Sequence, residues 1–294
     1  MSAGAYSYDP AGNIASRTID GTTTNFSYDA LDRLTGAGAI SYAYDGDGNR
    51  TSMSDTSGTT TYSYDAADQL SSVTPPGESP LTYSYDANGN ETTAGPWTYG
   101  FNLANQLVSA SNGTASASYS YDGDGNRLTM TAAGATTNYS WDPNFDVPEL
   151  SLERDSTGSL IRRYLYGEGR ISVTTPQTTA YFSVDNVGTP TALSDPTGAS
   201  LGSFDRNPFG DGLTSSGVDP SVADVPIGFT GELQDRVSGL VDLRARNYDR
   251  STGRFVSPDP MGQYEAPYGD QNIGEREAIP TQRRIRSREP IPMA

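Results

Sequence analysis

A short alternating pattern recurs along the first half of the chain: two aromatic residues, separated by one small residue and followed by Asp or Asn. Eight copies start at Tyr6, Phe26, Tyr42, Tyr62, Tyr83, Tyr99, Tyr119 and Tyr139, at spacings of 16 to 21 residues. Alternate residues of a β-strand point to the same side, so the two aromatics of a copy share one face. The pattern predicts a strand at each copy, and residues 1–145 show no helical period of useful length.

The residues that follow each aromatic pair predict turns. Asp, small residues and then Gly-Asn, as in residues 9–13, suit a tight turn because Gly and Asn tolerate positive φ. Copies ending in Gly-Asn alternate with copies carrying a Leu a few residues later, so the full repeat is a pair of units of about 36 residues. We expect each unit to be a β-hairpin and the fold to be all-β, built from antiparallel hairpins.

The repeated aromatics have two interpretations. Tyrosines stacked repeat over repeat can form an apolar wall whose hydroxyls reach water or a neighbouring turn. The same spacing would also suit a row of platforms for sugars, so glycan binding remains the alternative to the favoured wall. The second aromatics concerned are Tyr8, Tyr28, Tyr44, Tyr64, Tyr85 and Tyr121.

The regular spacing loosens after Trp141. Residues 150–154 and 160–166 still predict paired strands around a Ser-Thr-Gly turn, whereas the Gly-, Ser- and Asp-rich residues 210–225 predict a loop. The expected organisation is hairpin repeats over 1–146, less regular strands over 147–227, a distinct block over 228–264 and an Arg-containing tail over 265–294.

Composition excludes several kinds of chemistry. The chain has 36 Asp and Glu against 19 Arg, no Lys, and a net charge of −17. Without His or Cys it can form no disulfide, thiol nucleophile, zinc finger or Ser-His-Asp triad, and we expect no cofactor. Its acidity disfavours nucleic-acid binding. No apolar run reaches 18 residues, so no membrane span is expected, and no secretory signal is visible at the N-terminus.

Two DGDGN segments, residues 45–49 and 122–126, invite comparison with a calcium loop. An EF-hand loop needs Gly at its sixth position and Glu at its twelfth. The first segment has Arg50 and Thr56 there, and the second has Arg127 and Ala133. Both therefore predict turns, and we expect no metal site.

The block over residues 228–262 has the most specific motifs. It contains Phe-Thr-Gly at 229–231, an Asp-to-Leu stretch at 235–240, RNYD at 246–249, TGRF at 252–255 and SPDPMG at 257–262. With the aromatic-Asp units, this block resembles the Rhs/YD-repeat family and its Rhs repeat-associated core. The motif residues are Arg244, Arg246, Tyr248, Gly253, Arg254, Phe255, Pro260 and Gly262.

The resemblance implies a fold and a function. Members such as teneurins and insecticidal toxin-complex subunits wind YD hairpins into a spiralling β-sheet that closes into a hollow shell. In bacterial members the core closes one end and the polypeptide beyond it is a toxin held inside. We therefore expect a secreted or cell-surface bacterial protein whose partner is an enclosed C-terminal polypeptide or a partner toxin.

The family core is also similar to an aspartyl protease that cleaves its own chain with the Asp residues of two DPxG motifs. Asp259 matches the first, but the second, DPxGL, is absent from 263–294. Two carboxylates must share a proton in this chemistry. Asp249 is the weaker candidate partner; otherwise we expect it to pair with Arg244, Arg246 or Arg254. The chain is expected not to cleave itself.

Three kinds of function remain open from the sequence. The favoured one is a structural shell, or part of one, that scaffolds or encloses. About eight units are few for a closed shell, and exposed sheet edges invite partners, so further copies joined by β-strand addition are the second. A sugar-binding adhesin is the third. The tail, with its Arg-rich residues 283–288, is interpreted as a remnant, a disordered end or a docked strand.

Overall fold

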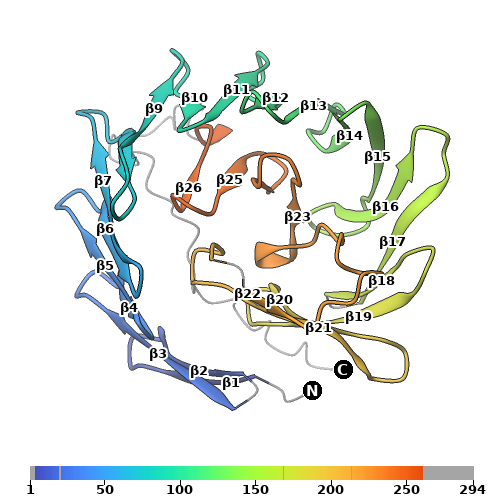
Figure 1. The fold of residues 1–294 in the computed structure, drawn as a ribbon, viewed down its shortest axis with the longest axis horizontal. Helices are drawn as coiled ribbons and strands as arrows, with labels where there is room; N and C mark the ends of the chain where they lie inside the picture. Colours follow the sequence, from blue (N-terminus) through green and yellow to red (C-terminus); the bar gives the residue numbers. More distant parts are fainter. Residues whose placement is uncertain (1–3, 20, 168, 213, 261–294) are drawn as a thin grey trace, which may run out of the picture.

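The computed structural model describes residues 4–19, 21–167, 169–212 and 214–260. The Arg-rich tail and Gly262 lie outside these residues. The described chain is all-β apart from one short 3-10 helix, as the sequence predicted. The strands follow one another around an arc, and a second, small sheet lies inside it (Figure 1).

The arc is a single sheet of 22 strands. Its strands are β1 (Ala5–Tyr8), β2 (Ile14–Ile19), β3 (Thr22–Tyr28), β4 (Leu34–Ala37), β5 (Ile40–Tyr44), β6 (Arg50–Asp55), β7 (Gly58–Tyr64), β8 (Leu70–Thr74), β9 (Leu81–Tyr85), β10 (Glu91–Ala94), β11 (Trp97–Phe101), β12 (Leu107–Ser111), β13 (Ser116–Tyr121), β14 (Arg127–Ala132), β15 (Ala135–Asp142), β16 (Glu149–Asp155), β17 (Leu160–Tyr166), β18 (Arg170–Thr174), β19 (Thr179–Val184), β20 (Pro190–Ser194), β21 (Ser200–Asp205) and β22 (Thr214–Ser216). The inner elements are η1 (Phe229–Gly231), β23 (Leu233–Gln234), β24 (Val241–Asp242), β25 (Asn247–Asp249) and β26 (Arg254–Phe255).

Each strand of the arc pairs antiparallel with the next one along the chain, from β1 to β22. The predicted hairpins are thus confirmed, including the pair β16–β17 around the turn at residues 156–158. The ladder continues unbroken across residue 146, and the expected division of the chain there stays a prediction. The predicted loop over 210–225 was partly wrong, because it contains β22. The polar residues of this edge strand have no alternation that sequence could reveal.

The two ends of the arc meet without joining. Among the described residues no ladder connects β1 with β22, so both remain edge strands. Side chains bridge the seam instead: Arg17 on β2 lies 3.2 Å from the Asp205 carboxylate, and the Asn186 N–H donates to the Tyr6 hydroxyl at 3.3 Å. The described chain is therefore a curled but open sheet.

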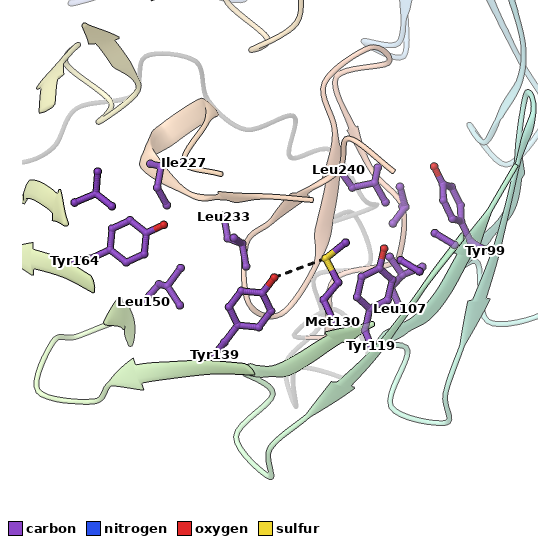
Figure 2. Close-up of a cluster of buried hydrophobic side chains, with 14 of the residues drawn as sticks. Tyr99, Leu107, Tyr119, Met130, Tyr139, Leu150, Tyr164, Ile227, Leu233 and Leu240 are labelled. Atoms are coloured by element: carbon purple, nitrogen blue, oxygen red, sulfur yellow. Dashed lines mark hydrogen bonds between the residues drawn. The ribbon is translucent and has the colours of Figure 1, made fainter. Parts of the chain in front are cut away.

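The main core lies between the inner face of the arc and the small inner sheet. Inward side chains from the arc, such as Tyr139 and Leu150, pack against Leu233 and Leu240 of the inner block (Figure 2). The Tyr139 hydroxyl also approaches the Met130 sulfur at 3.7 Å. Burial of this apolar surface holds the block inside the curve of the sheet.

The same hydrogen bond, from a backbone N–H to an Asp carboxylate, recurs in several turns. In the turn after β1, Asn13 donates its backbone N–H to the Asp9 carboxylate at 2.8 Å, and the same bond recurs at Asp45 and Asp122. In the turn after β16, the Thr157 hydroxyl, with backbone N–H groups, lowers the pKa of Asp155 below its ordinary value. Both DGDGN segments thus use their first carboxylate to close a turn, as predicted.

Candidate functional site: the tyrosine wall and the docked core block

The second aromatic of most hairpin units ties neighbouring hairpins together. The ladder shifts register at this position, for example between Ser120 and Tyr121, because a bulge forms there. The ring then reaches back to the chain, and Tyr121 donates its hydroxyl to the Leu107 carbonyl at 2.7 Å. The same bond is made by Tyr28 to Ile14, Tyr44 to Leu34, Tyr64 to Arg50, Tyr85 to Leu70, Trp141 to Arg127 and Tyr166 to Leu150.

The first aromatics complete the wall. Tyr42, Tyr62, Tyr99, Tyr119, Tyr139 and Tyr164 are all buried on the inner face. Burial also affects the second aromatics. It raises the pKa of Tyr44, two residues after Tyr42 on the same face, to about 12, so the Tyr44 hydroxyl keeps its proton and stays a donor. The wall interpretation of the tyrosines fits this geometry. Tyr8 differs, because it is 59% exposed at the β1 edge.

Replacing Tyr121 with Phe should lower the free energy of unfolding by about 1 kcal/mol, because the Leu107 carbonyl loses its donor while the ring still packs. Urea unfolding measures the difference. Tyr8→Phe is the matched control and should change stability by less than about 0.5 kcal/mol, since the exposed ring has water as an alternative partner. Equal effects of the two substitutions would contradict the proposed tie.

A buried arginine fastens the core block to the arc. Arg127, the first residue of β14, has its guanidinium 3.0 Å from Asp235 and 2.9 Å from Asp242, and it donates to the Asn247 side chain at 3.0 Å. The side chain is 1% exposed and its charge lies 4.3 Å from the centre of the Tyr119 ring. The two carboxylates raise its pKa further despite burial, so it is always charged.

Other arginines make the same connection through backbone carbonyls. Arg50 on β6 donates to the Ser251 and Thr252 carbonyls at 3.1 and 2.7 Å. In the opposite direction, Arg254 on β26 donates to the Asp68 carbonyl at 3.0 Å, and Arg244 donates twice to the Pro148 carbonyl at 2.7 and 2.9 Å. A guanidinium carries several donors in a fixed plane, which suits it to bridging separate segments.

The two candidate catalytic aspartates have different hydrogen-bond and ion-pair partners in the structure. Asp259 lies 3.1 Å from the Arg246 guanidinium, which stacks on Phe255 at 3.6 Å. The Asp249 carboxylate accepts hydrogen bonds from Ser251 and Thr252 and closes the turn between β25 and β26. The expected ion pair of Asp249 with Arg244, Arg246 or Arg254 was wrong within the described residues, because local turn donors occupy this carboxylate.

The remaining core-motif residues have structural positions. Tyr248 is 1% exposed and donates to the Phe209 carbonyl at 3.1 Å. Gly253 has a φ of 73° and approaches the Phe209 ring so closely that a Cβ would lie 3.0 Å from it, so Gly is required twice over. Pro260 ends the described chain and is exposed.

Sequence reasoning missed the inward position that directly follows each turn. It holds Leu34, Leu70 and Leu107 in one kind of unit, whereas the other kind has Ile14 in its first copy and then Arg50, Glu91 and Arg127, and all seven are buried. The signal was present as Gly-Asn followed by a charged residue. It could not be interpreted from the sequence alone, because the partners that hold these charged side chains inside belong to the core block, which is distant in sequence.

Within the ranges that the structure describes, no helix is long and apolar enough to cross a membrane. The same residues contain no group of three or more acidic side chains placed to hold a metal ion.

Comparisons with known proteins place this geometry in a family. The teneurin YD-shell family matches residues 1–94 and 144–271, which is more than half of the chain. The tRNA nuclease WapA of Bacillus subtilis is 30% identical over 194 residues, covering 64% of this chain and 8% of that protein. The probable deoxyribonuclease RhsB of Dickeya dadantii is 31% identical over 147 residues, covering 47% of this chain and 10% of its own length.

Among solved structures, the Photorhabdus luminescens Tc holotoxin pore aligns with 94% of this chain and 18% of its own, at 16% identity and a TM-score of 0.49. This chain thus spans only a small part of each relative. The hairpin repeats, their inner tyrosine wall and the family match agree with the resemblance to Rhs/YD-repeat proteins. The chain belongs to the teneurin YD-shell family and forms a shell-type β-sheet scaffold.

Proposed function

We propose that this chain is the core-bearing part of a YD shell, and that the shell encloses the polypeptide that continues beyond the core block. The supporting observation is the inner block over residues 228–258, which packs against the concave face of the sheet and is held there by buried arginines. A segment fixed inside the curve delivers the following chain to the interior. The relatives named as nucleases suggest a toxin as cargo, which would act on a target outside a bacterial cell that secretes or displays the shell.

The enclosure is tested by protease protection. An unstructured reporter peptide with one specific protease site is appended after Ala294, and its cleavage is compared with that of the free peptide. Enclosure should slow cleavage at least about tenfold, because the protease must wait for the shell to open. Equal rates would overturn the proposal. Loss of the protection at urea concentrations that unfold the chain would show that the folded shell causes it.

We also propose that the chain does not cleave itself. Asp259 is paired with Arg246 and Asp249 closes a turn, and the sequence has no DPxGL motif to supply the second carboxylate that this chemistry needs. Purified protein incubated at pH 4 to 8 should keep its intact mass by mass spectrometry. A shorter product that disappears on Asp259→Asn substitution would contradict this expectation.

A second function, assembly through sheet edges, is favoured by β1 and β22, each of which has one edge without a partner strand among the residues that the structure describes. Edge strands present free N–H and C=O groups to another strand. That strand is supplied either by the rest of a longer shell or by another copy of this chain. Mass photometry distinguishes the two, since copies joined edge to edge appear as multiples of the chain mass. Glycan binding by the tyrosines is less well supported, because most of their hydroxyls donate within the sheet.

A further inference from the structure

The outer face of the arc is polar over most hairpin units. The residue between the two aromatics of a unit points outward, and it is Ser, Ala or Gly in the first eight units. Its neighbour at the bulge of the next strand is often a Ser or Thr that bonds back to it. Ser71 donates to the Ser63 carbonyl at 3.0 Å, and Ser151 donates to the Ser140 carbonyl at 2.9 Å. The fold therefore needs no large apolar side chain at either position.

The unit formed by β17 and β18 departs from this pattern at both positions. Leu165 stands between the two aromatics and is 57% exposed, and Ile171, at the bulge of β18, is 41% exposed. Leu165 lies opposite Ser172, and Ser172 lies opposite Tyr181 on β19, which is 39% exposed. We call Leu165, Ile171 and Tyr181 the apolar outer patch. Exposed apolar side chains gathered on neighbouring strands are typical of a contact site.

Positive charge without an acidic partner lies beside the apolar outer patch. Arg163 is exposed and precedes Leu165 by two residues, so both point to the same side. Arg154, on the neighbouring strand β16, is also exposed and donates to the Gly158 carbonyl at 2.9 Å. In the part of the chain that the structure describes, no carboxylate lies within 4 Å of either guanidinium. The patch therefore suits a partner surface that is both apolar and acidic.

The turn between β3 and β4 has this chemistry. Leu31 stands at its tip and is 72% exposed, with Asp29 before it and Asp32 directly after it. The turns at residues 9–13 and 45–49 lie at the same rim of the sheet, because successive strands alternate in direction. These three turns together contain five Asp and one Arg, and that Arg is paired with Asp29 at 2.6 Å. The rim around Leu31 is therefore negatively charged.

We propose that the apolar outer patch binds the Leu31 turn of a second copy of this chain, so that copies join head to tail. Leu31 covers the apolar side chains of the patch, and the carboxylates of its rim face Arg163 and Arg154. One copy cannot make this contact with itself, because β3–β4 and β17–β19 lie on opposite sides of the arc (Figure 1).

The two contacting surfaces differ, so the contact is heterologous and can continue from copy to copy. It uses the outer face of the sheet and leaves the edges of β1 and β22 free. The inference does not depend on what the shell encloses.

Sedimentation equilibrium tests the contact, at protein concentrations up to about 100 µM because a small interface binds weakly. Salt at about 0.15 M screens the repulsion between the acidic bodies beyond about 8 Å. The average mass should rise above the chain mass of 31.2 kDa as the concentration increases. Leu165→Ser and Ile171→Thr restore the residue types of other units, and each should weaken association at least about tenfold. Leu31→Ser should weaken it as much.

Two matched controls separate this contact from general stickiness. Leu128 holds the bulge position of Ile171 in another unit and is also 41% exposed, but its outward neighbour is Ser120. Leu103 stands at a turn tip and is 103% exposed, but Asn and not Asp flanks it. Leu128→Thr and Leu103→Ser should therefore associate as the unchanged protein does. All five variants change exposed residues and should keep its thermal melt.

Mixing two defective variants tests the head-to-tail geometry. Leu165→Ser retains an intact Leu31 turn, and Leu31→Ser retains an intact patch, so the mixture should form pairs and nothing larger. A mixture that stays at the chain mass would overturn the proposal, as would an unchanged protein that does not associate. Equal weakening by the two controls would also overturn it. Association that every variant retains would contradict the proposal and assign the contact to the strand edges, while protease protection of an enclosed peptide would be unaffected.

Discussion

Replacing Arg127 with Met should lower the free energy of unfolding by about 3 to 5 kcal/mol, the largest effect expected of any single substitution in this chain. The substitution removes a buried cation and leaves Asp235 and Asp242, each about 1% exposed at the side chain, without a counter-charge inside the shell. The thioether fills part of the volume but cannot solvate two carboxylates. Urea unfolding at pH 7 measures the loss, and limited proteolysis should find new cleavage within residues 228–258 as the block undocks.

A matched set of variants isolates the electrostatic cause. Arg154→Met makes the same chemical change on the exposed surface and should alter stability by less than about 0.5 kcal/mol. Adding Asp235→Asn and Asp242→Asn to Arg127→Met should recover part of the loss, because the uncompensated charges disappear. A loss below about 1 kcal/mol for Arg127→Met, or no recovery in the triple variant, would show that apolar packing alone holds the block.

The hairpin architecture could be predicted because its determinants are local. In YSYDGDGN at residues 119–126, the alternation of aromatics defines the strand and its inner face, and Asp122 with Asn126 defines the turn within five residues. Each such unit behaves alike wherever it stands, so repetition made the prediction stronger. The wall interpretation of the tyrosines also follows from local sequence, since both aromatics of a unit are expected to face the same side.

The docking of the inner block could not be predicted, because its contacts join distant segments. Arg127 and Asp235 are 108 residues apart, and Arg50 meets Thr252 across 202 residues. A charged residue after a turn is ordinarily solvent-exposed, and nothing local distinguishes Arg127 from an exposed arginine. The partners of Asp249 were mistaken for the opposite reason: the nearby Ser251 and Thr252 were available as donors, and these short-range bonds prevailed over ion pairs with the motif arginines.

The same comparison bears on the function. The local repeat determines the hairpins of the sheet but not what the sheet surrounds. The contacts of the buried arginines with the distant core block determine which segment packs against its inner face. Arg50 and Arg127 occupy the position that Leu fills in the alternate units, so they exchange apolar packing for a connection to the core block. Charged residues at these inward positions cost apolar burial. This cost is explained if one role of the scaffold is to hold the core block in place.

Glu91 should make the docked state less stable as the pH rises. It occupies the same inward position on β10, is 2% exposed, and its Oε1 atom has no hydrogen-bond partner. Its backbone N–H donates to the Val256 carbonyl at 2.8 Å, so it lies at the contact between the arc and the inner block. Burial first, and then the charge of Asp249 on β25, raise its pKa well above the ordinary value, although Arg254 on β26 and the hydroxyl of Tyr85 on β9 act in the opposite direction.

The folded protein therefore keeps this proton at pH values where the unfolded chain, with a pKa near 4.5, has lost it. The stabilisation that comes from this retained proton is complete below about pH 4.5 and is lost as the pH rises toward the pKa of Glu91 in the folded protein. The free energy of unfolding then falls by at most about 1.4 kcal/mol per pH unit for one proton. Glu91→Gln keeps the neutral shape at every pH. Subtracting its unfolding free energy from that of the unchanged protein cancels the titration of all other carboxylates and should leave this slope alone.

Urea unfolding of both proteins from pH 4 to 9 measures the difference, and Glu78→Gln, an exposed change of the same kind, is the control. The unchanged protein should lose stability relative to Glu91→Gln across this range, whereas Glu78→Gln should follow the unchanged protein. A constant offset between the two curves would contradict the prediction, because it would mean that Glu91 has the same pKa in the folded and the unfolded protein. Since the Val256 carbonyl accepts the Glu91 N–H, hydrogen exchange at Glu91 should accelerate over the same pH window, beyond the intrinsic rise of exchange with pH.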